Sequence, residues 1–540
     1  MRRIKIVATV GPVTESLEML EKLIEKGVNV FRLNFSHGDH AWHGRVIDRI
    51  QKINKTRAYP CAIMLDTKGP EIRTGDLKVP IQLKKGKTLI LTVDHASDYE
   101  ASGKVSVNYD AFIYDVAVGD TILVDNGNMT LRVKEKKKKD VFCEIIDGGE
   151  LTSRRHLNLP GKDVSLDSIT DKDWADIHFG IKKGVDFIAL SFVRSAEEIR
   201  KVKQFLQDKK SFISVIAKIE TLDAVERLGS IFEASDGIMV ARGDLGAEIP
   251  FAEVPIVQWE IARMAGQYRK PVIVATQMLE SMQHSPMPTR AEVTDVFAAT
   301  WQRNDAVMLS GETAGGKFPL KSVEAMRSIA LATEKNYLTK RSIRRTEPDC
   351  ERSEFCKSAA AAAIDLPEIK AIVVITRSGH MANMMASFRP QVPVLAMTNE
   401  IDTCRRMQLV WGVEAAEIKF SSDPEKTIQR AMKKIIEQKM CSIKKGDKFV
   451  LLSDILAGKN MMPALQIREF GGISLTKYKM THIVIPTGAC PGRARPGSLS
   501  NGRRNPLKNA RDLSIHPALR GSVEMTRRKR SIGHFMFVWL

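Results

Sequence analysis

Short apolar runs rich in β-branched residues recur from residue 4 to residue 310, and each ends in polar residues. Most of them are followed by an amphipathic stretch with helical periodicity. Alternation of buried strands with helices is typical of a parallel sheet, and eight such units predict a closed (β/α)8 TIM barrel of the α/β class. The runs are 4–10, 28–36, 62–66, 187–191, 214–220, 237–244, 271–276 and 306–310.

The interval between the third run and a helix that begins near Thr170 has a different texture. It contains short segments of alternating apolar and polar residues, separated by turn signals such as Asp147-Gly148-Gly149. This pattern predicts a small β-barrel domain inserted in a βα loop. An insertion at that place would lie over the carboxyl ends of the barrel strands, where a mobile lid acts on a barrel site.

After the eighth unit comes an Arg-rich break and then an alanine-rich helix over 357–364, followed by further apolar runs that predict a separate α/β domain. Past Phe470 the periodicity fails, and we expect most of the remaining residues to be disordered. The predicted organisation is a catalytic barrel of residues 1–70 and 168–341, a lid of 71–167, a C-terminal domain of 350–470 and a basic tail of 471–540.

The chain has 83 basic and 64 acidic residues, a net charge of +19. Such an excess is typical of proteins that bind nucleic acid or a membrane surface. However, 13 of the basic residues against two acidic ones fall in 471–540, which leaves only +8 on the first 470 residues. The basic residues of the tail lack the aromatic or helical patterning expected of a nucleic-acid surface, so we expect no nucleic-acid partner.

No apolar run reaches the ~18–20 residues that span a bilayer, so we expect no membrane association. The short apolar stretch after Met1-Arg2-Arg3 ends at Gly11-Pro12 without a small-residue cleavage site, which argues against a signal peptide. The seven cysteines are scattered and form no CxxC pair, as is typical of reduced thiols. These features predict a cytoplasmic protein.

Polar residues end several of the predicted strands at alternate positions. Residues two apart in a strand point to the same side, and the carboxyl ends of barrel strands share one face, so these side chains should gather there. Glu220 and Asp244 suit a hard divalent cation, and Arg32 and Lys218 suit phosphate, a combination used in phosphoryl transfer. The full set is Arg32, Asn34, Ser36, Asp66, Thr67, Lys218, Glu220, Arg242, Asp244 and Thr276.

Each member of this set also has a purely structural interpretation. Lys218 and Glu220 alone would equally fit an exposed ion pair, and Asp66 alone would better fit a cap on the following turn. His37 beside Ser36 invites a role as general base, but a loop histidine with structural hydrogen bonds is commoner. Their joint occurrence at the same end of successive strands favours a site.

A second phosphate motif is rejected on its sequence. Residues 311–317, GETAGGK, have the glycine and lysine spacing of a P-loop and follow a predicted strand. Phe318 stands where that loop needs a Ser or Thr hydroxyl for its metal, and Pro319 is a poor start for the long helix that should follow.

Six segments together resemble the motifs of pyruvate kinase, in that family's order. The resemblance extends from near residue 1 to about 420 and weakens towards 470. It implies phosphoryl transfer from phosphoenolpyruvate to ADP, giving pyruvate and ATP in the last step of glycolysis, and it agrees with a barrel, an inserted lid and a C-terminal α/β domain. The segments are VFRLNFSHG (30–38), LDTKGPEIRT (65–74), AKIE (217–220), IMVARGDLG (238–246), VATQMLES (274–281) and MLSGETA (308–314).

The resemblance also implies two cations. Glu220 and Asp244 would hold Mg²⁺ or Mn²⁺ between phosphate and substrate. A potassium ion would be bound by residues at the ends of the second and third strands, and Glu71 is the family's usual sign of potassium dependence. The potassium ligands would be Asn34, Ser36, Asp66 and Thr67.

The remaining roles that the resemblance implies concern substrate and nucleotide. Lys218 and Arg32 would neutralise charge on the transferring group, the amides of Gly243 and Asp244 would bind the substrate carboxylate, and Thr276 would lie near the enolate methylene. Nucleotide contacts would come from four residues, and one of these, Arg155, replaces a lysine that is common in the family. They are Asn34, His37, Arg73 and Arg155. The resemblance further implies a homotetramer.

Two departures limit what can be carried over. Residues 376–380, TRSGH, resemble the phosphate loop of the family's effector site, but Met381 replaces a usual hydroxyl residue and residues 454–462 replace the glycine-rich effector loop. Sugar-phosphate activation is therefore not inferred. The tail after Gly471 matches nothing in the family, and we expect it to be irrelevant to turnover.

One other enzyme class shares part of the predicted site. A magnesium-dependent barrel lyase or aldolase acting on pyruvate-like acids would use a similar carboxylate pair. Such an enzyme would need neither Asn34 and Ser36 nor Arg73, and it would need no lid, so the full set of residues favours the kinase.

Overall fold

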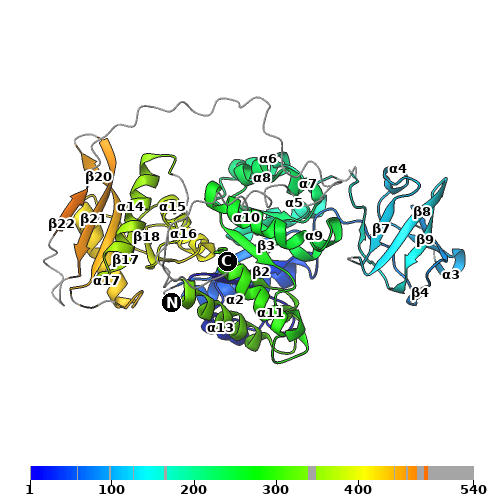
Figure 1. Cartoon of the computed structure of the whole chain (residues 1–540), viewed down its shortest axis with the longest axis horizontal. Helices are drawn as coiled ribbons and strands as arrows, with labels where there is room; N and C mark the ends of the chain where they lie inside the picture. Colours follow the sequence, from blue (N-terminus) through cyan, green and yellow to red (C-terminus); the bar gives the residue numbers. More distant parts are fainter. Residues whose placement is uncertain are drawn as a thin grey trace, which may run out of the picture. The chain divides into compact units, whose positions relative to one another are not determined.

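The protein is described here by a computed structural model of residues 2–484, apart from 58, 96–98, 126, 163–166, 338–347, 443, 445, 458–459 and 471–479. Among these residues no helix is both long and apolar enough to cross a membrane. Figure 1 shows the chain coloured along the sequence, with the helices and strands labelled.

Eight parallel strands form the predicted closed barrel, in the order β1-β16-β15-β14-β13-β12-β3-β2. Nearly every residue in them is buried, because the barrel interior covers one face and helices cover the other, so each strand reads as a continuous apolar run. The strands are β1 Lys5–Thr9, β2 Val30–Asn34, β3 Ala62–Asp66, β12 Phe187–Leu190, β13 Ser214–Ile219, β14 Gly237–Ala241, β15 Val272–Ala275 and β16 Ala306–Leu309.

Amphipathic helices surround the barrel, and local signals in the sequence fix their ends. Thr170 and Thr289 each close a capping box at a helix start, and Gly27 ends α1 in the left-handed conformation with φ 119°. The main helices are α1 Leu17–Lys26, α2 His40–Asn54, α5 Asp171–Lys183, α6 Ala196–Asp208, α8 Leu228–Ala234, α10 Val254–Tyr268, α11 Arg290–Trp301 and α13 Pro319–Tyr337.

Shorter helices follow several strands. The segment with P-loop spacing begins with a short helix, α12, which ends at Ala314. The long helix α13 begins at Pro319, so the expectation that this proline is a poor helix start is wrong; proline is tolerated in a first helical turn. The short helices of the barrel are α7 Leu222–Glu226, α9 Arg242–Glu248, α12 Gly311–Ala314 and the 3-10 turn η1 Glu280–Gln283.

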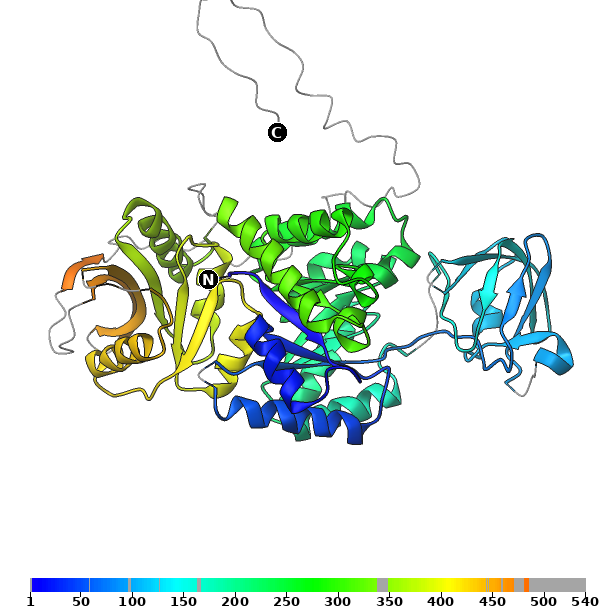
Figure 2. The same cartoon turned by 90° about the horizontal axis from the view of Figure 1, so that it is seen from below.

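The insertion between β3 and α5 is a β domain with its own apolar core, as the interrupted rhythm predicts. Two segments of chain join it to the barrel (Figure 2). Burial alternates along its longer strands, as expected when one face packs inward. A six-stranded sheet, β11-β7-β8-β9-β5-β6, contains β5 Thr88–Thr92, β6 Lys104–Ser106, β7 Thr121–Val124, β8 Met129–Lys137, β9 Asp140–Asp147 and β11 Leu157–Asn158; β4 Ile81–Leu83 pairs with β10 Gly149–Leu151, and two short helices are α3 Tyr99–Ser102 and α4 Phe112–Asp115.

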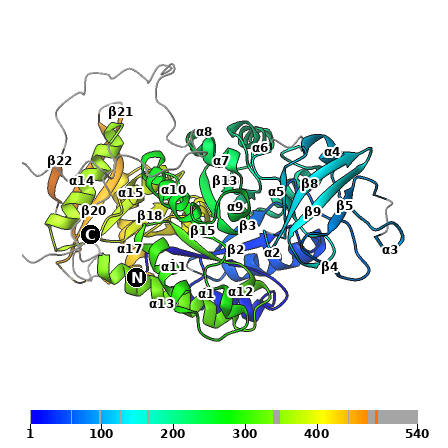
Figure 3. The same ribbon diagram turned by 45° about the vertical axis from the view of Figure 1, so that its right-hand side comes forward.

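The C-terminal domain is a six-stranded sheet, β19-β18-β17-β20-β21-β22, with helices on both faces (Figures 1 and 3). Alternate residues of one strand separate two cores: Ile372 and Val374 pack with α14 and α15, whereas Ala371 and Val373 pack with α17. Its elements are α14 Glu351–Asp365, β17 Ile369–Ile375, α15 His380–Ser387, β18 Val394–Thr398, α16 Ile401–Arg406, η2 Met407–Leu409, β19 Val413–Glu417, α17 Pro424–Glu437, β20 Lys448–Ala457, β21 Asn460–Glu469 and β22 Met480–Val484.

The sheet continues beyond the predicted domain end at residue 470. Residues 454–462 belong largely to the antiparallel pair β20–β21, and β22 adds a further antiparallel strand within the predicted tail, so the predicted domain end is wrong. Residues 471–479 and 485–540 lie outside the described residues.

A buried ion pair joins the barrel to the C-terminal domain. Arg389 donates to Asp305 Oδ1 at 3.1 Å and Oδ2 at 2.7 Å, and both side chains are 3% exposed. The Asp305 carboxylate also accepts the backbone amides of Val272 and Trp411, at 3.1 and 3.0 Å. One carboxylate therefore binds a barrel strand and two parts of the C-terminal domain.

We expect Arg389→Met to destabilise the protein by about 3–5 kcal/mol, because it leaves the Asp305 charge buried without its counter-ion. The first transition in a urea unfolding curve measures this loss. Arg200→Met, which removes an exposed cation beside Glu197, is the matched control and should change little. Equal midpoints for the two variants would contradict the assignment.

Candidate active site

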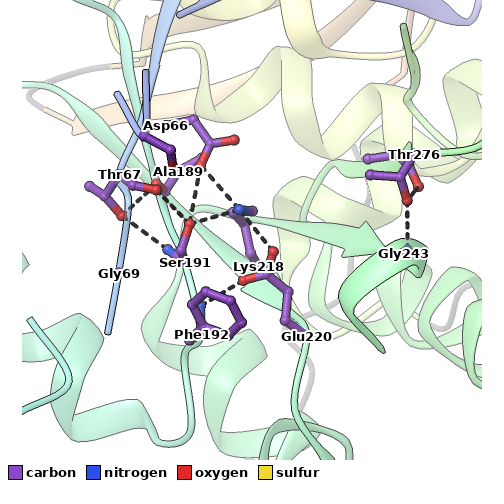
Figure 4. A network of polar contacts seen from close by, with 12 residues as sticks. Asp66, Thr67, Gly69, Ala189, Ser191, Phe192, Lys218, Glu220, Gly243 and Thr276 are labelled. Carbon is purple, nitrogen blue, oxygen red and sulfur yellow. Dashed lines mark hydrogen bonds and ion pairs between the residues drawn. The ribbon is translucent and has the colours of Figure 1, made fainter. Parts of the chain in front are cut away.

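Lys218, near the end of β13, lies at the centre of a buried polar cluster at the carboxyl ends of the barrel strands (Figure 4). Its ammonium group donates to Ser191 Oγ at 2.7 Å and lies 2.8 Å from Glu220 Oε1 and 3.1 Å from Asp66 Oδ1. The Lys218 residue is 8% exposed. The side chains come from β13, the end of β3 and the residue after β12, so the predicted convergence of strand ends occurs.

Asp66 is shared by two cations. Arg32 Nε donates to Asp66 Oδ2 at 2.5 Å, on the carboxylate edge away from Lys218, and Arg32 also donates to Thr9 Oγ1 at 3.0 Å. Complete burial would raise the Asp66 pKa, but Arg32 and Lys218 together lower it below its ordinary value. Asp66 is therefore a permanent anion that keeps both cations in place.

Glu220 is fully buried and only partly satisfied. Its Oε2 accepts the Phe192 amide at 2.6 Å, whereas Oε1 lies beside Lys218 without a well-aligned hydrogen bond. Burial raises the Glu220 pKa and Asp244 raises it further, against the lowering effect of Lys218. In the same cluster burial would lower the Lys218 pKa, but Asp66 and Glu220 raise it, so the ammonium stays charged.

A strained turn after β12 completes this cluster. Phe192 has a left-handed backbone with φ 52°, which is unusual for a residue with a side chain. This conformation directs the Phe192 amide to Glu220, while the preceding Ser191 hydroxyl donates to Thr67 O at 2.6 Å and accepts from Lys218. Sequence reasoning assigned no role to Ser191 or Phe192, although Ser191 is the polar residue that ends the fourth apolar run.

Thr276 and Gly243 lie together at the ends of the neighbouring strands β15 and β14 (Figure 4). The Gly243 amide donates to Thr276 Oγ1 at 2.8 Å, and Oγ1 in turn donates to Ala275 O at 2.6 Å. Thr276 and Gln277 both have positive φ, 67° and 52°. The Thr276 hydroxyl is thus fixed in a strained turn after β15, beside the start of α9.

Arg242 holds this second turn, a role that its alternation with Asp244 did not reveal. It donates to Thr276 O at 2.7 Å and Gln277 O at 3.2 Å, and it forms an ion pair with Asp295 of α11 at 2.7 Å. The Arg242 guanidinium therefore supports the backbone of Thr276 and does not point to the Lys218 cluster.

The four oxygen-bearing residues proposed for a monovalent cation lie on adjoining segments. Asn34 and Asp66 are opposite each other in the pairing of β2 with β3, and Asn34 Oδ1 accepts the Ser36 amide at 3.1 Å. Thr67 follows Asp66 and accepts the Ser191 amide at 3.1 Å through its hydroxyl. The fold brings these residues to one edge of the Lys218 cluster.

The other predicted nucleotide contacts lie outside this cluster. Arg73 donates to both carboxylate oxygens of Glu71, at 2.7 and 3.0 Å. This contact is the main cause of the raised Arg73 pKa, and Asp244 raises the pKa further. Arg155 binds Thr152 Oγ1 at 2.5 Å and Asp125 Oδ1 at 3.1 Å within the inserted domain. His37 is exposed, and its carbonyl accepts from His43 Nε2 at 2.8 Å.

Glu220 and Asp244 could hold a metal only with the help of other ligands. Within the described part of the chain, no group of three or more His, Cys, Asp or Glu side chains is arranged to bind a metal ion. Magnesium is commonly bound by one or two carboxylates plus water and phosphate oxygens. Glu220 Oε1 contacts the Lys218 ammonium but forms no aligned hydrogen bond among the described residues, so it could serve as such a ligand. The pair is therefore compatible with a cation that the substrate helps to bind.

Comparison with known proteins identifies relatives over most of the chain. The family model "Pyruvate kinase, barrel domain" matches residues 1–323, and "Pyruvate kinase, alpha/beta domain" matches 353–464. Pyruvate kinase isozyme G, chloroplastic, of Nicotiana tabacum is 48% identical over 458 residues, 84% of this chain and 80% of that protein. Pyruvate kinase of Staphylococcus aureus is 43% identical over 472 residues, 86% of this chain and 80% of that protein.

A solved structure gives the same result. The crystal structure of a pyruvate kinase from Cryptosporidium parvum superposes with a TM-score of 0.79 at 35% sequence identity. The match covers 86% of this chain and 96% of that chain.

The Asp66 cluster predicts a pH-dependent stability. Because the folded-state pKa of Asp66 lies below its unfolded value, its stabilising effect is complete above the unfolded pKa of about 3.9 and is lost as the pH falls through the folded pKa. Asp66→Asn should therefore lower the free energy of unfolding at pH 7 by about 3–5 kcal/mol, with a smaller difference from wild type below pH ~4.

Urea unfolding of both proteins at pH 7 and at pH 3.5 measures this difference. Asp48→Asn is the control, because Asp48 forms an ion pair with Lys183 at 2.8 Å but is 60% exposed. A constant difference between wild type and Asp66→Asn at both pH values would exclude Asp66 as the stabilising anion.

Proposed function

We propose the following roles for residues of this chain, which belongs to the pyruvate kinase family and transfers a phosphoryl group from phosphoenolpyruvate to ADP, giving pyruvate and ATP. The observation that supports them best is the buried Lys218 cluster at the carboxyl ends of the strands, where barrel enzymes place their chemistry (Figure 4). The family matches over most of the chain do not favour the lyase or aldolase alternative.

Glu220 and Asp244 are proposed to bind Mg²⁺ or Mn²⁺. Glu220 is buried with Lys218 as its counter-ion at Oε1, and Asp244 is close enough to raise the pKa of Glu220. The cation would polarise the phosphate and offset its charge. Since only two protein carboxylates are available, the cation should bind more tightly when a phosphate ligand is present.

Asn34, Ser36, Asp66 and Thr67 are proposed to bind K⁺. The proposal is supported by the register of Asn34 against Asp66 and by the oxygen-rich character of the group. Asp66 already pairs with both Arg32 and Lys218, so a weakly bound monovalent ion fits this edge better than a second divalent one. Glu71 would contribute indirectly, since it binds Arg73 in this structure.

Lys218 and Arg32 are proposed to stabilise negative charge on the transferring phosphoryl group. Both residues are 8% exposed, and fixed charges act more strongly where water is excluded. Their shared contact with Asp66 fixes the spacing of the two cations before substrate arrives, so little reorganisation is required when charge develops.

Thr276 and the amides of Gly243 and Asp244 are proposed to orient the enolate of the substrate. In this structure Thr276 Oγ1 accepts the Gly243 amide, so a substrate carboxylate that took this amide would replace the hydroxyl as acceptor. Thr276 would then be free to orient the water that protonates the methylene carbon, completing the formation of pyruvate.

Asn34, His37, Arg73 and Arg155 are proposed to contact the nucleotide. The support is the family resemblance, together with the location of Arg73 and Arg155 in the inserted domain that begins after β3. Arg73 would exchange its bond to Glu71 for a nucleotide phosphate when the lid closes. The limits given above for the barrel and the lid remain proposals as well.

A homotetramer in the cytoplasm is also proposed. Helices α10 and α11, and the turn that precedes α10, expose large apolar side chains that a second copy of the chain could cover. Six of the seven cysteines are described and all six are free, as expected in a reducing compartment. Sedimentation velocity would test the assembly, and a monomer at micromolar concentration would exclude it. The exposed residues are Phe251, Ile256, Trp259, Phe297 and Trp301.

We expect Lys218→Ala to lower kcat by at least about 100-fold, because it removes a major electrostatic group from the site. An assay that couples pyruvate formation to lactate dehydrogenase measures it, with phosphoenolpyruvate, ADP, Mg²⁺ and K⁺. Lys209→Ala, on the exposed end of α6, is the control and should retain wild-type turnover. Unchanged turnover in Lys218→Ala would remove Lys218 from the mechanism.

Potassium dependence is expected to change at Glu71. A lysine there would place an ammonium group near the proposed monovalent site, so Glu71→Lys should need potassium much less than wild type. Initial rates with and without 100 mM KCl, at constant ionic strength, measure the dependence. If the variant requires potassium as strongly as the parent, Glu71 does not report on this site.

A further inference from the structure

A cavity of about 580 Å³ lies between the amino ends of the barrel strands and the C-terminal domain. From the barrel it is lined by residues that immediately precede strands β14 and β15, among them Asp236 and Lys270. From the C-terminal domain it is lined by His380 and Asn383 of α15 and by Arg406 at the end of α16. It is thus at the opposite end of the strands from the Lys218 cluster.

The charges around this cavity are predominantly positive. Lys270 Nζ donates to Ser235 O at 2.8 Å, and Arg406 donates to Phe212 O at 3.2 Å and Thr403 Oγ1 at 3.0 Å, and all three of these acceptors are uncharged. Arg269, next to Lys270, pairs with Asp349, a carboxylate that is 65% exposed.

The single carboxylate among the residues that line the cavity is already neutralised. Asp236 accepts from Lys203 Nζ at 2.6 Å and from the Val215 amide at 2.8 Å. Among the described residues, Lys270 and Arg406 therefore have no direct ion pair with a carboxylate, although Asp236 acts on both at longer range.

Burial and mutual repulsion both act on these cations. Burial lowers the pKa of Lys270; Asp236 opposes this effect, and Lys203 adds to it. Burial also lowers the pKa of His380, with Arg269, Arg352 and Lys270 adding to the effect. An anion bound among these groups would relieve the repulsion and would gain charge-assisted hydrogen bonds.

Two residues that line the cavity each carry a buried polar atom for which the described residues supply no hydrogen-bond partner. The two atoms are Arg269 Nε, a donor, and Asn383 Oδ1, an acceptor. Unpaired buried polar atoms are uncommon in folded proteins and often mark a place where a ligand or water belongs. One donor and one acceptor would suit a ligand that has both an anionic group and a hydroxyl.

We propose that this cavity binds a small molecule with a phosphate group, held by Lys270, Arg406 and Arg269. The volume is sufficient for a phosphorylated metabolite, and the cations come from both domains, so the ligand would join the barrel to the C-terminal domain. Lys270 also immediately precedes Pro271 and β15, and Thr276 follows β15 at its other end. The bound ligand would therefore contact the strand that positions the Thr276 hydroxyl.

Isothermal titration calorimetry of the full-length protein with inorganic phosphate, and then with glycerol 3-phosphate, tests the proposal by counting binding sites. The double variant Lys270→Ala/Arg406→Ala should lose one equivalent of bound phosphate or bind it at least about 10-fold more weakly, which corresponds to ~1.4 kcal/mol. It should keep its kcat, because neither residue belongs to the Lys218 site. Lys270→Ala alone, which removes a single described hydrogen bond, is used if the double variant does not fold.

The matched control is Arg377→Ala, in the neighbouring cavity formed by residues 376–381 and α17. Loss of the equivalent in the Lys270 variants with its retention in Arg377→Ala would support the proposal. Its loss only in Arg377→Ala would place the phosphate in the neighbouring cavity and overturn the proposal. The proposal is equally overturned if the wild-type protein binds no more phosphate than the Lys270 variants do.

Discussion

The structure depends on the need to pair four charges that are buried at the ends of three barrel strands. Arg32, Lys218, Asp66 and Glu220 are each 8% exposed or less, and none could remain charged there alone. Asp66 binds both cations through its two oxygens, so the spacing between β2, β3 and β13 is set by ion pairs as well as by backbone hydrogen bonds. The neighbouring turns at Phe192 and Thr276 are strained, and their strain is tolerated because this network and Arg242 fix their backbones.

The pKa values of the two carboxylates that contact Lys218 shift in opposite directions, which indicates a structural role for Asp66 and a chemical role for Glu220. The pKa of Asp66 is lowered because it has two cationic partners, whereas the pKa of Glu220 is raised because burial and Asp244 outweigh Lys218. Asp66 is thus a fixed counter-ion. The Glu220 pKa is raised even though Lys218 contacts Oε1, so Glu220 gains from a further positive charge and a divalent cation would complete the site instead of disturbing it.

The barrel and the location of its site could be predicted from the sequence because two simple periodicities determine them. Buried parallel strands read as apolar runs, and alternate polar residues at their ends must share a face, which identified Arg32, Asp66, Lys218 and Glu220. Ser191 was missed because a serine after a strand is also an ordinary turn residue. The left-handed backbones of Phe192 and Thr276 and the support of Thr276 by Arg242 depend on contacts between distant segments, and no local pattern encodes them. The strand β22 was missed because its pairing with β21 compensates for a weak local signal.

The binding of a divalent cation at Glu220 tests this account most directly. Manganese affinity can be measured by electron paramagnetic resonance of free Mn²⁺, in the presence of phosphoenolpyruvate, for wild type, Glu220→Gln and the control Glu248→Gln. Glu248 is a nearby carboxylate that instead binds Asn158 at 3.0 Å. The account predicts that Glu220→Gln binds Mn²⁺ at least about 10-fold more weakly while Glu248→Gln resembles wild type. Equal Mn²⁺ affinity in wild type and Glu220→Gln would contradict it.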